Sequence, residues 1–226
     1  MIAAREFDLL VFDWDGTLMD SEAHIVSCIE AALHDAGLPA VARDDIRNII
    51  GLGLQEAIQA LAPDADERLR ERITRRYRAH FFSSEREAPV LFEGAREMLH
   101  RLHAQGYLLA VATGKGRQGL NHVLEQSGLK HVFHSTRTVD EARSKPHPQM
   151  LHDIMDGLGV APSDTLMIGD TEYDLLMAHN AGAHALAVSG GAHERERLLQ
   201  CRPLACLERV TELTRWLRPF DYAAPP

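Results

Sequence analysis

The chain has few cysteines, no long apolar run and no surplus of positive charge. Its three cysteines, Cys28, Cys201 and Cys206, are odd in number and lack metal-type spacing, which argues against a disulfide framework and a structural zinc. No segment reaches the apolar length of a membrane-spanning helix, and charges interrupt the first residues before a signal-peptide core can form. These absences predict a cytoplasmic protein whose thiols are ordinary packing or surface groups.

The charge balance excludes two classes of partner. The formal net charge of the 226 residues is -9 at pH 7, whereas binding to nucleic acid or to anionic membranes needs clustered positive charge. We therefore expect neither partner, and any cationic site must be local. The thirteen histidines are scattered without a metal-type frame. The only lysines are Lys115, Lys130 and Lys145, so their positions are informative.

Apolar runs separated by helical patterns predict an α/β fold. Short continuous runs of this kind suit buried parallel strands, and most of the intervening helical patterns end at glycines. The expected strands are Leu9–Phe12, Leu108–Ala112, Val132–Thr136, Leu166–Ile168 and Ala185–Val188. The expected helices among them are Glu93–Gln105, Arg117–Ser127, Pro148–Leu158 and Asp174–Asn180. The alternation predicts a doubly wound, Rossmann-like parallel sheet with helices on both faces.

One block interrupts the alternation after the first strand. Between residues 20 and 88 only helical patterns occur, and they cover Glu22–Ala36, Asp44–Ile50, Leu54–Leu61 and Asp66–Phe82. We therefore expect two domains: an α/β core formed by residues 1–19 and 89–226, and an inserted α-helical domain formed by residues 20–88. The tail, residues 219–226, is expected to be loose.

Two carboxylates follow the first predicted strand. Asp13 and Asp15 stand two residues apart, and alternate side chains of an extended segment point the same way. Gly16 behind them permits a sharp turn. One carboxylate of such a pair can act as a nucleophile, and the other can protonate a leaving oxygen. The same pattern also occurs as an acidic turn without a catalytic role. Whether Asp13 and Asp15 are catalytic therefore depends on the residues that the fold brings next to them.

Three further polar features stand at or just beyond the ends of later strands, where open α/β sheets bind their ligands. Thr113 and Gly114 end the second strand, and the threonine hydroxyl can donate to a phosphate oxygen. Lys145 precedes a proline, which favours extended backbone at the lysine and would fix its direction towards an anion. Asp170 and Asp174 follow the fourth strand. With the first acid, they can form a magnesium site, because Mg²⁺ prefers carboxylate oxygens.

Together, and in this order, the four features resemble the motifs of the haloacid dehalogenase superfamily of phosphatases, over almost the whole chain. The segment from Asp13 to Thr17 is similar to the D-x-D-G-T motif of that family. The resemblance implies that Asp13 is the nucleophile and Asp15 the acid/base. It implies that Thr113, Gly114 and Lys145 bind the phosphate.

The resemblance also implies a metal ion and a cap. The magnesium ligands would be Asp13, Asp15, Asp170 and Asp174, and the helical insert of residues 20–88 would be a C1 cap. Phosphoglycolate-phosphatase-like members are the most similar in overall look. The implied function is Mg²⁺-dependent hydrolysis of a small phosphate monoester through an aspartyl-phosphate on Asp13. The implied partner is a small phosphorylated metabolite, and the implied assembly is a monomer or a homodimer.

Other branches of the superfamily differ at particular residues. The dehalogenase branch usually lacks the second acid, so Asp15 favours phosphate chemistry. The phosphonatase branch needs a lysine in the cap, and none occurs between Asp20 and Val90. A phosphomutase similar to β-phosphoglucomutase shares every core motif and stays open. A catalytically silent binding protein of the same fold would be expected to have lost catalytic acids, and none is missing.

Substrate choice is expected to lie in the cap. The loop Gly51–Gln55 can face the core site, and Arg47, Tyr77, Arg78 and His80 are candidate contacts. One of the two arginines is expected to pair with a second anionic group on the substrate. A solvated face of an arginine-rich helix explains these residues equally well. Phosphoglycolate, a sugar phosphate such as a muramic-acid phosphate, and pyrophosphate stay open as substrates.

Overall fold

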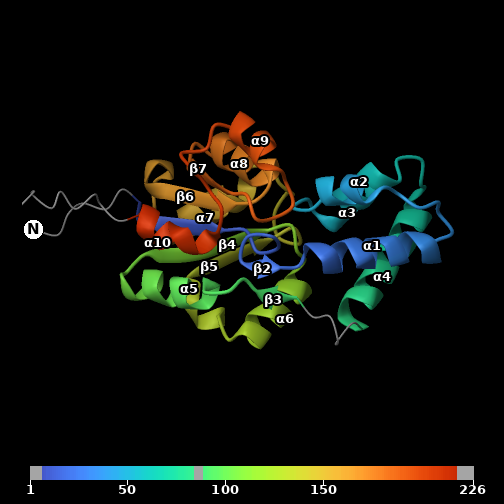
Figure 1. Cartoon of the computed structure of the whole chain (residues 1–226), viewed down its shortest axis with the longest axis horizontal. Coiled ribbons are helices and arrows are strands. Elements are labelled where there is room, and N and C mark those ends of the chain that lie inside the picture. Colours follow the sequence, from blue (N-terminus) through green and yellow to red (C-terminus); the bar gives the residue numbers. More distant parts are fainter. Residues whose placement is uncertain (1–6, 84–88, 218–226) are drawn as a thin grey trace, which may run out of the picture.

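The computed structural model describes residues 7–83 and 89–217, and its core is a six-stranded parallel sheet (Figure 1). The strand order is β5-β4-β1-β6-β7-β8. Strand β1 therefore lies between β4 and β6, and the strand order runs outwards from it in both directions. The strands are β1 (Leu9–Phe12), β4 (Leu108–Thr113), β5 (Ser135–Thr138), β6 (Thr165–Gly169), β7 (His184–Val188) and β8 (Cys206–Leu207). This arrangement confirms the predicted doubly wound α/β fold.

Both faces of the sheet are buried, which explains why the strands are continuously apolar. In β1, Leu10 and Phe12 point to a hydrophobic cluster with α5 (Ala95–Ala104), α6 (Arg117–Ser127) and α10 (Leu213–Trp216). Leu9 and Val11 point to the opposite cluster. The helices that contribute to it are α7 (Gln149–Leu158), α8 (Glu172–Asn180) and α9 (Arg195–Gln200). Side chains of a strand alternate between faces, so each of the four finds an apolar partner.

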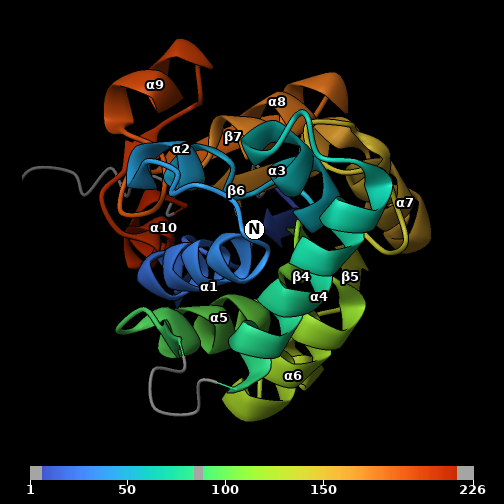
Figure 2. The same ribbon diagram turned by 90° about the vertical axis from the view of Figure 1, so that its right-hand side faces the viewer.

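The segment between β2 (Met19–Asp20) and β3 (Val90–Leu91) carries four helices at one end of the sheet (Figures 1 and 2). They are α1 (Glu22–Asp35), α2 (Arg43–Asn48), α3 (Leu54–Leu61) and α4 (Glu67–Ser83). They have a hydrophobic cluster of their own, including Ile29, Ile46, Ile58 and Ile73. A two-stranded antiparallel ribbon of β2 and β3 flanks them. Residues 84–88, which include the predicted boundary, lie outside the described residues.

Several predicted elements need correction. The strand predicted at Val132–Thr136 is wrong at its start: Lys130–Val132 form a 3₁₀ turn, and β5 begins at Ser135. Val132 is apolar because it packs in the cluster with α5 and α6. The strands β2, β3 and β8 were not predicted, because two-residue strands leave no apolar run in the sequence. The helices α9 and α10 were not predicted either. The predicted loose tail, residues 219–226, lies outside the described residues. Within the described part of the chain, no helix combines the length and apolarity that a membrane crossing requires.

Candidate active site

The site lies where the strand order reverses, at the carboxyl end of β1. Asp13 follows β1 directly, and its backbone N–H donates to the carbonyl of Ile168 in β6 (N···O 2.9 Å). Asp170 follows β6 on one side, and Thr113 ends β4 on the other. Parallel strands bring their carboxyl ends to one edge, and the switch point leaves a crevice there. The predicted site residues of three strands therefore converge.

A buried lysine and three buried acids form the centre of the site. The ammonium of Lys145 lies 2.7 Å from Oδ1 of Asp13 and 2.6 Å from Oδ1 of Asp174. One carboxylate oxygen each of Asp13, Asp170 and Asp174 lies within 4.8 Å of the others. All four side chains are at most 2% exposed. One ammonium lies beside three carboxylates, so the negative charge of the ionised acids is not fully compensated. A further cation could compensate it.

Hydrogen bonds fix the two acids after β6. The Thr17 hydroxyl donates to Oδ1 of Asp170 (2.6 Å), and the backbone N–H of Ala192 donates to Oδ2 (2.9 Å). The Thr171 hydroxyl donates to Oδ2 of Asp174 (2.7 Å) at the start of α8. Gly16 contacts the Asp170 carboxylate so closely that any Cβ there would collide with it. A larger residue at position 16 would therefore displace an acid of the cluster.

Burial and mutual repulsion perturb the titration of this cluster. Burial raises the pKa of the Asp13 carboxyl to about 7, although the nearby Lys145 ammonium lowers it. Burial, together with the charges of Asp13 and Asp174, also raises the pKa of Asp170 well above its ordinary value. Burial lowers the pKa of Lys145, but Asp13 and Asp174 outweigh it and raise that pKa on balance. The lysine therefore stays charged. Any added positive charge would stabilise the ionised form of the acids.

Asp15 is oriented away from the three-acid cluster. Its Oδ2 lies 2.9 Å from the ammonium of Lys115, and its Oδ1 accepts a hydrogen bond from the Ser21 hydroxyl (2.7 Å). The same ammonium lies 4.4 Å from the ring centroid of Phe81 in α4. Neither Lys115 nor Ser21 was predicted from the sequence to belong to the site. The scarcity of lysine was the one signal that singled out Lys115. A role for Asp15 as a metal ligand stays a prediction.

The loop before α3 lies beside the end of β4 and the loop that carries Lys145. Gly114 lies against the carbonyls of Gly51 and Leu52, at a distance that leaves no space for a Cβ. The backbone N–H of Gly53 donates to the Ser144 hydroxyl next to Lys145 (2.7 Å). The buried Thr113 hydroxyl accepts from the backbone N–H of residue 115 (3.2 Å). The structure thus places the predicted cap loop beside Thr113, Gly114 and Lys145.

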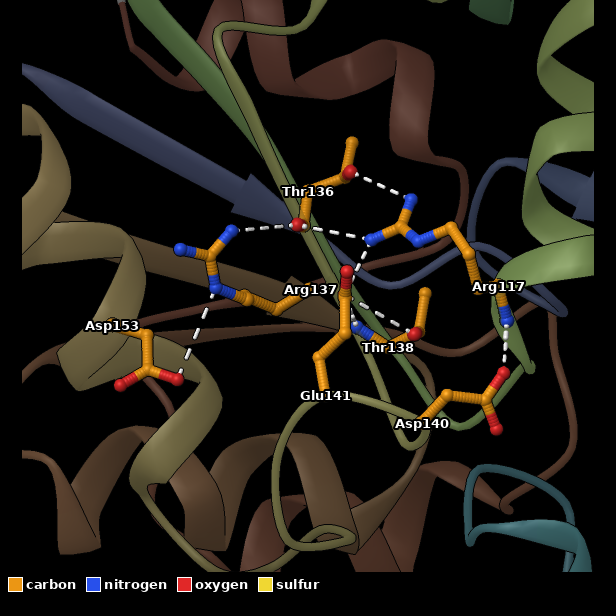
Figure 3. Close-up of polar contacts among 7 residues, drawn as sticks. All are labelled: Arg117, Thr136, Arg137, Thr138, Asp140, Glu141 and Asp153. Atoms are coloured by element: carbon orange, nitrogen blue, oxygen red, sulfur yellow. Dashed lines mark hydrogen bonds and ion pairs between the residues drawn. The ribbon is translucent and has the colours of Figure 1, made fainter.

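A polar network holds the loop that leads to Lys145 (Figure 3). Arg117 at the start of α6 donates to the hydroxyl of Thr136 in β5 (2.9 Å) and pairs with Glu141. Glu141 also accepts from the backbone N–H of Thr138 (3.1 Å), and Asp140 accepts from the backbone N–H of Arg117 (2.6 Å). The end of β5, the loop and α6 are therefore joined, which fixes the approach of the lysine to the site.

A cavity of about 750 Å³ lies between the helical segment and the core. Asp13, Asp15, Thr113 and Gly114 line it from the core. The predicted contacts Tyr77 and Arg78 line it from α4, and the predicted loop lines it through Gly51, Leu52, Leu54 and Gln55.

Two predicted cap contacts are not among the described residues that line the cavity. Arg47 is not among the residues that line the cavity and pairs with Glu22 in α1 (Nε···Oε1 2.7 Å). His80 also lies outside the lining and contacts Asp35 (Nε2···Oδ2 3.0 Å). Both side chains pair with acids outside the lining, and Arg47 also lies 3.7 Å from Oε1 of Glu194 in the core.

The arginines offer a direct test of this correction. On a phosphate ester that carries a carboxylate, we expect Arg78→Ala to lower kcat/KM by about two- to fivefold, because an exposed charge contributes modestly. Arg47→Ala should leave it unchanged and serves as the matched control. p-Nitrophenyl phosphate, which has no second anion, should respond to neither variant. An equal loss for both variants would contradict the assignment.

Comparisons with known proteins agree with this geometry. The family model described as haloacid dehalogenase-like hydrolase matches residues 10–188. The probable phosphatase IndB of Dickeya dadantii is 40% identical over 210 residues, covering 91% of each chain. A phosphoglycolate phosphatase of Aliivibrio fischeri is 31% identical over 207 residues, covering 88% of this chain and 91% of that relative.

A solved structure extends the match to three dimensions. The crystal structure of a predicted phosphoglycolate phosphatase from Haemophilus somnus superposes with a TM-score of 0.83 at 25% identity. It covers 94% of this chain and 99% of the other. The family match spans β1 to β7 and so includes the acids, the threonine and the lysine of the site. The chain belongs to the haloacid dehalogenase-like hydrolase family and is an enzyme of its hydrolase class.

Proposed function

We propose that this enzyme is a Mg²⁺-dependent phosphatase that hydrolyses a small phosphate monoester through an aspartyl-phosphate on Asp13. The observation that carries the proposal is the buried pair of Asp13 and Lys145, 2.7 Å apart at the switch point. A carboxylate with an adjacent fixed ammonium can approach an anionic phosphate, because the ammonium offsets the repulsion. The names of the phosphatase relatives support the same chemistry.

In the first step an Asp13 oxygen attacks phosphorus and the bond from phosphorus to the ester oxygen breaks. Lys145 stabilises the charge on the phosphoryl oxygens, and Thr113 and Gly114 position them from the end of β4. Asp15, in its protonated form, gives its proton to the departing alcohol. In the second step Asp15, now a carboxylate, takes a proton from water as the water attacks phosphorus, and the Asp13 carboxylate is released with inorganic phosphate.

Asp13, Asp170 and Asp174 suit a magnesium ion. They are buried carboxylates, their oxygens lie within 4.8 Å of one another, and one ammonium leaves their charge incompletely compensated. Mg²⁺ prefers such oxygen ligands and retains several waters. When bound, the ion supplies positive charge against the phosphoryl oxygens. The helical segment, in the role of a cap, excludes bulk water and strengthens the electrostatics of the site.

Metal binding should appear in thermal stability and depend on pH. The pKa of Asp13 is raised from 3.8 to about 7, so the metal-free fold loses stability as pH rises towards 7. Mg²⁺ needs the ionised acids and should restore that loss. We therefore expect millimolar Mg²⁺ to raise Tm more at about pH 8 than at about pH 5. Calorimetry measures this without any turnover, and an equal rise at both pH values would contradict the assigned ligands.

A panel of phosphate monoesters tests the proposed activity. We expect release of inorganic phosphate that is proportional to the alcohol formed. A phosphomutase would return the phosphoryl group to its sugar and release little phosphate. A catalytically silent protein would bind esters without hydrolysing them. Either result would overturn the proposed hydrolysis.

A further inference from the structure

The cap side of the catalytic cavity is apolar and aromatic. From α4 it receives Tyr77, Phe81 and Phe82, and the Phe81 ring packs against both neighbours with centroid distances of 5.8 and 5.6 Å. Aliphatic side chains complete this wall: Ile25, Ile29, Ile49, Ile50, Leu52 and Leu54. Aromatic residues are only 6% of the chain. Their concentration beside Asp15 and Lys115 therefore indicates that the cavity suits a ligand with an apolar part.

Cations are scarce in the same cavity. The lysine of the described lining, Lys115, is engaged by Asp15, and Lys145, which is outside the lining, is engaged by Asp13 and Asp174. The remaining basic residues in the described lining are Arg78 and Arg143, and both are exposed. The lining also has three acids outside the catalytic set, namely Glu56, Asp140 and Glu141, which are exposed as well. A carboxylate close to the phosphate would therefore meet mostly apolar side chains on the cap side, and the exposed arginines would compensate its desolvation only modestly.

We propose that the substrate is the phosphate monoester of a neutral alcohol with an apolar, ring-bearing body, and not of a carboxylated alcohol such as glycolate. This inference rests on the proposed phosphatase function. A volume of about 750 Å³ is in the range that holds drug-sized ligands, and glycolate would leave most of it unfilled. Aromatic rings pack favourably in offset or edge-to-face contact, which the Phe81 wall offers.

Tyr77 adds a polar contact for such a body. Its side chain lines the cavity, and no hydrogen bond to its hydroxyl is formed within the described residues. Burial and the charge of Asp15 raise the pKa of Tyr77 well above its ordinary value, so the hydroxyl stays protonated. It is thus available to donate to a neutral oxygen of the leaving group.

The test compares two esters with the same linker. 3-Phenylpropyl phosphate and 4-phosphooxybutanoate have leaving alcohols of similar acidity, so their kcat/KM values report on the rest of the leaving group. We expect the phenyl ester to be favoured by at least about tenfold, from burial of the ring. A preference for the carboxylate, or equal values, would overturn the inference.

Two variants test whether the apolar wall of the cavity causes this preference for the phenyl ester. Leu54→Lys adds a cation to the cavity and should lower kcat/KM for the phenyl ester while raising it for the carboxylate. Leu199→Lys, at a 48% exposed leucine of α9 outside the lining, is the matched control and should change neither. If Leu54→Lys leaves the ratio unchanged while its circular dichroism is normal, the wall does not select the substrate.

Hydrolysis of p-nitrophenyl phosphate separates the two proposals. If the wild type hydrolyses this ester and also prefers the carboxylate, only the inference about the leaving group is wrong. If it hydrolyses none of the three esters with Mg²⁺ present, the proposed phosphatase function is wrong as well.

Discussion

The Asp13→Asn variant is expected to lose roughly 10⁴-fold or more in kcat, as removal of a nucleophile does in other covalent enzymes. An amide at this position cannot form the acyl phosphate, and it faces Lys145 across 2.7 Å without a charge to offset the ammonium. Steady-state phosphate release at saturating substrate measures the effect.

Stability serves as the control for this variant. The pKa of Asp13 is raised to about 7, which means that the fold does not favour its ionised form. Lys145 keeps Asp174 as a partner, so replacement of Asp13 by a neutral isostere should keep or raise Tm in the metal-free protein. A folded Asp13→Asn variant with near-normal activity would show that the nucleophile is a different residue.

Removal of divalent cations is the second change with a large expected effect. Excess chelator should lower the hydrolysis rate by about a thousandfold, because electrostatic stabilisation of the phosphoryl group is the main source of catalysis in such sites. Added Mg²⁺ should restore the rate. Ca²⁺ should restore it poorly, because it takes more ligands at longer distances than the compact cluster of Asp13, Asp170 and Asp174 suits.

The chelator experiment has a clear contrary outcome. Undiminished turnover at saturating chelator would mean that Lys145 alone supplies the positive charge and that the three acids have another role. The Asp170→Asn variant provides a second measurement, because it removes one acid but keeps the size of the side chain. Its amide oxygen can still accept from the backbone N–H of Ala192, and its amide NH₂ can donate to the Thr17 hydroxyl. It should raise the Mg²⁺ concentration needed for half-maximal rate.

The strongly patterned parts of the fold were predictable from the sequence. The runs Leu9–Phe12 and Leu166–Ile168 indicated strands because both faces of the sheet are buried, so no polar residue interrupts them. Their carboxyl ends must meet at one edge of a parallel sheet, which predicted that Asp13 and Asp170 lie near each other. The structure brings Lys145 to the same point.

The unpredicted features depend on contacts between distant segments. Lys115 pairs with Asp15 across about a hundred residues, and the composition marked the lysine only as rare. Arg47 and Arg78 were equally good candidates for a substrate contact from the sequence, because the local sequence does not show which face of a helix lies over a cavity. Two-residue strands such as β8 pair because β7 presents a free edge, and their own residues have no strand pattern.

The most direct measurement of the central claim is chemical trapping of the phosphorylated enzyme. The Asp15→Asn variant keeps the nucleophile but lacks the base that activates water, so the intermediate should accumulate with a substrate such as p-nitrophenyl phosphate, whose leaving group needs no proton. Borohydride reduction of the quenched enzyme converts an acyl phosphate to an alcohol, and peptide mass spectrometry then locates it. The account predicts homoserine at position 13, and none in the Asp13→Asn variant. Reduction at any other residue, or unmodified Asp13 during continued turnover, would contradict it.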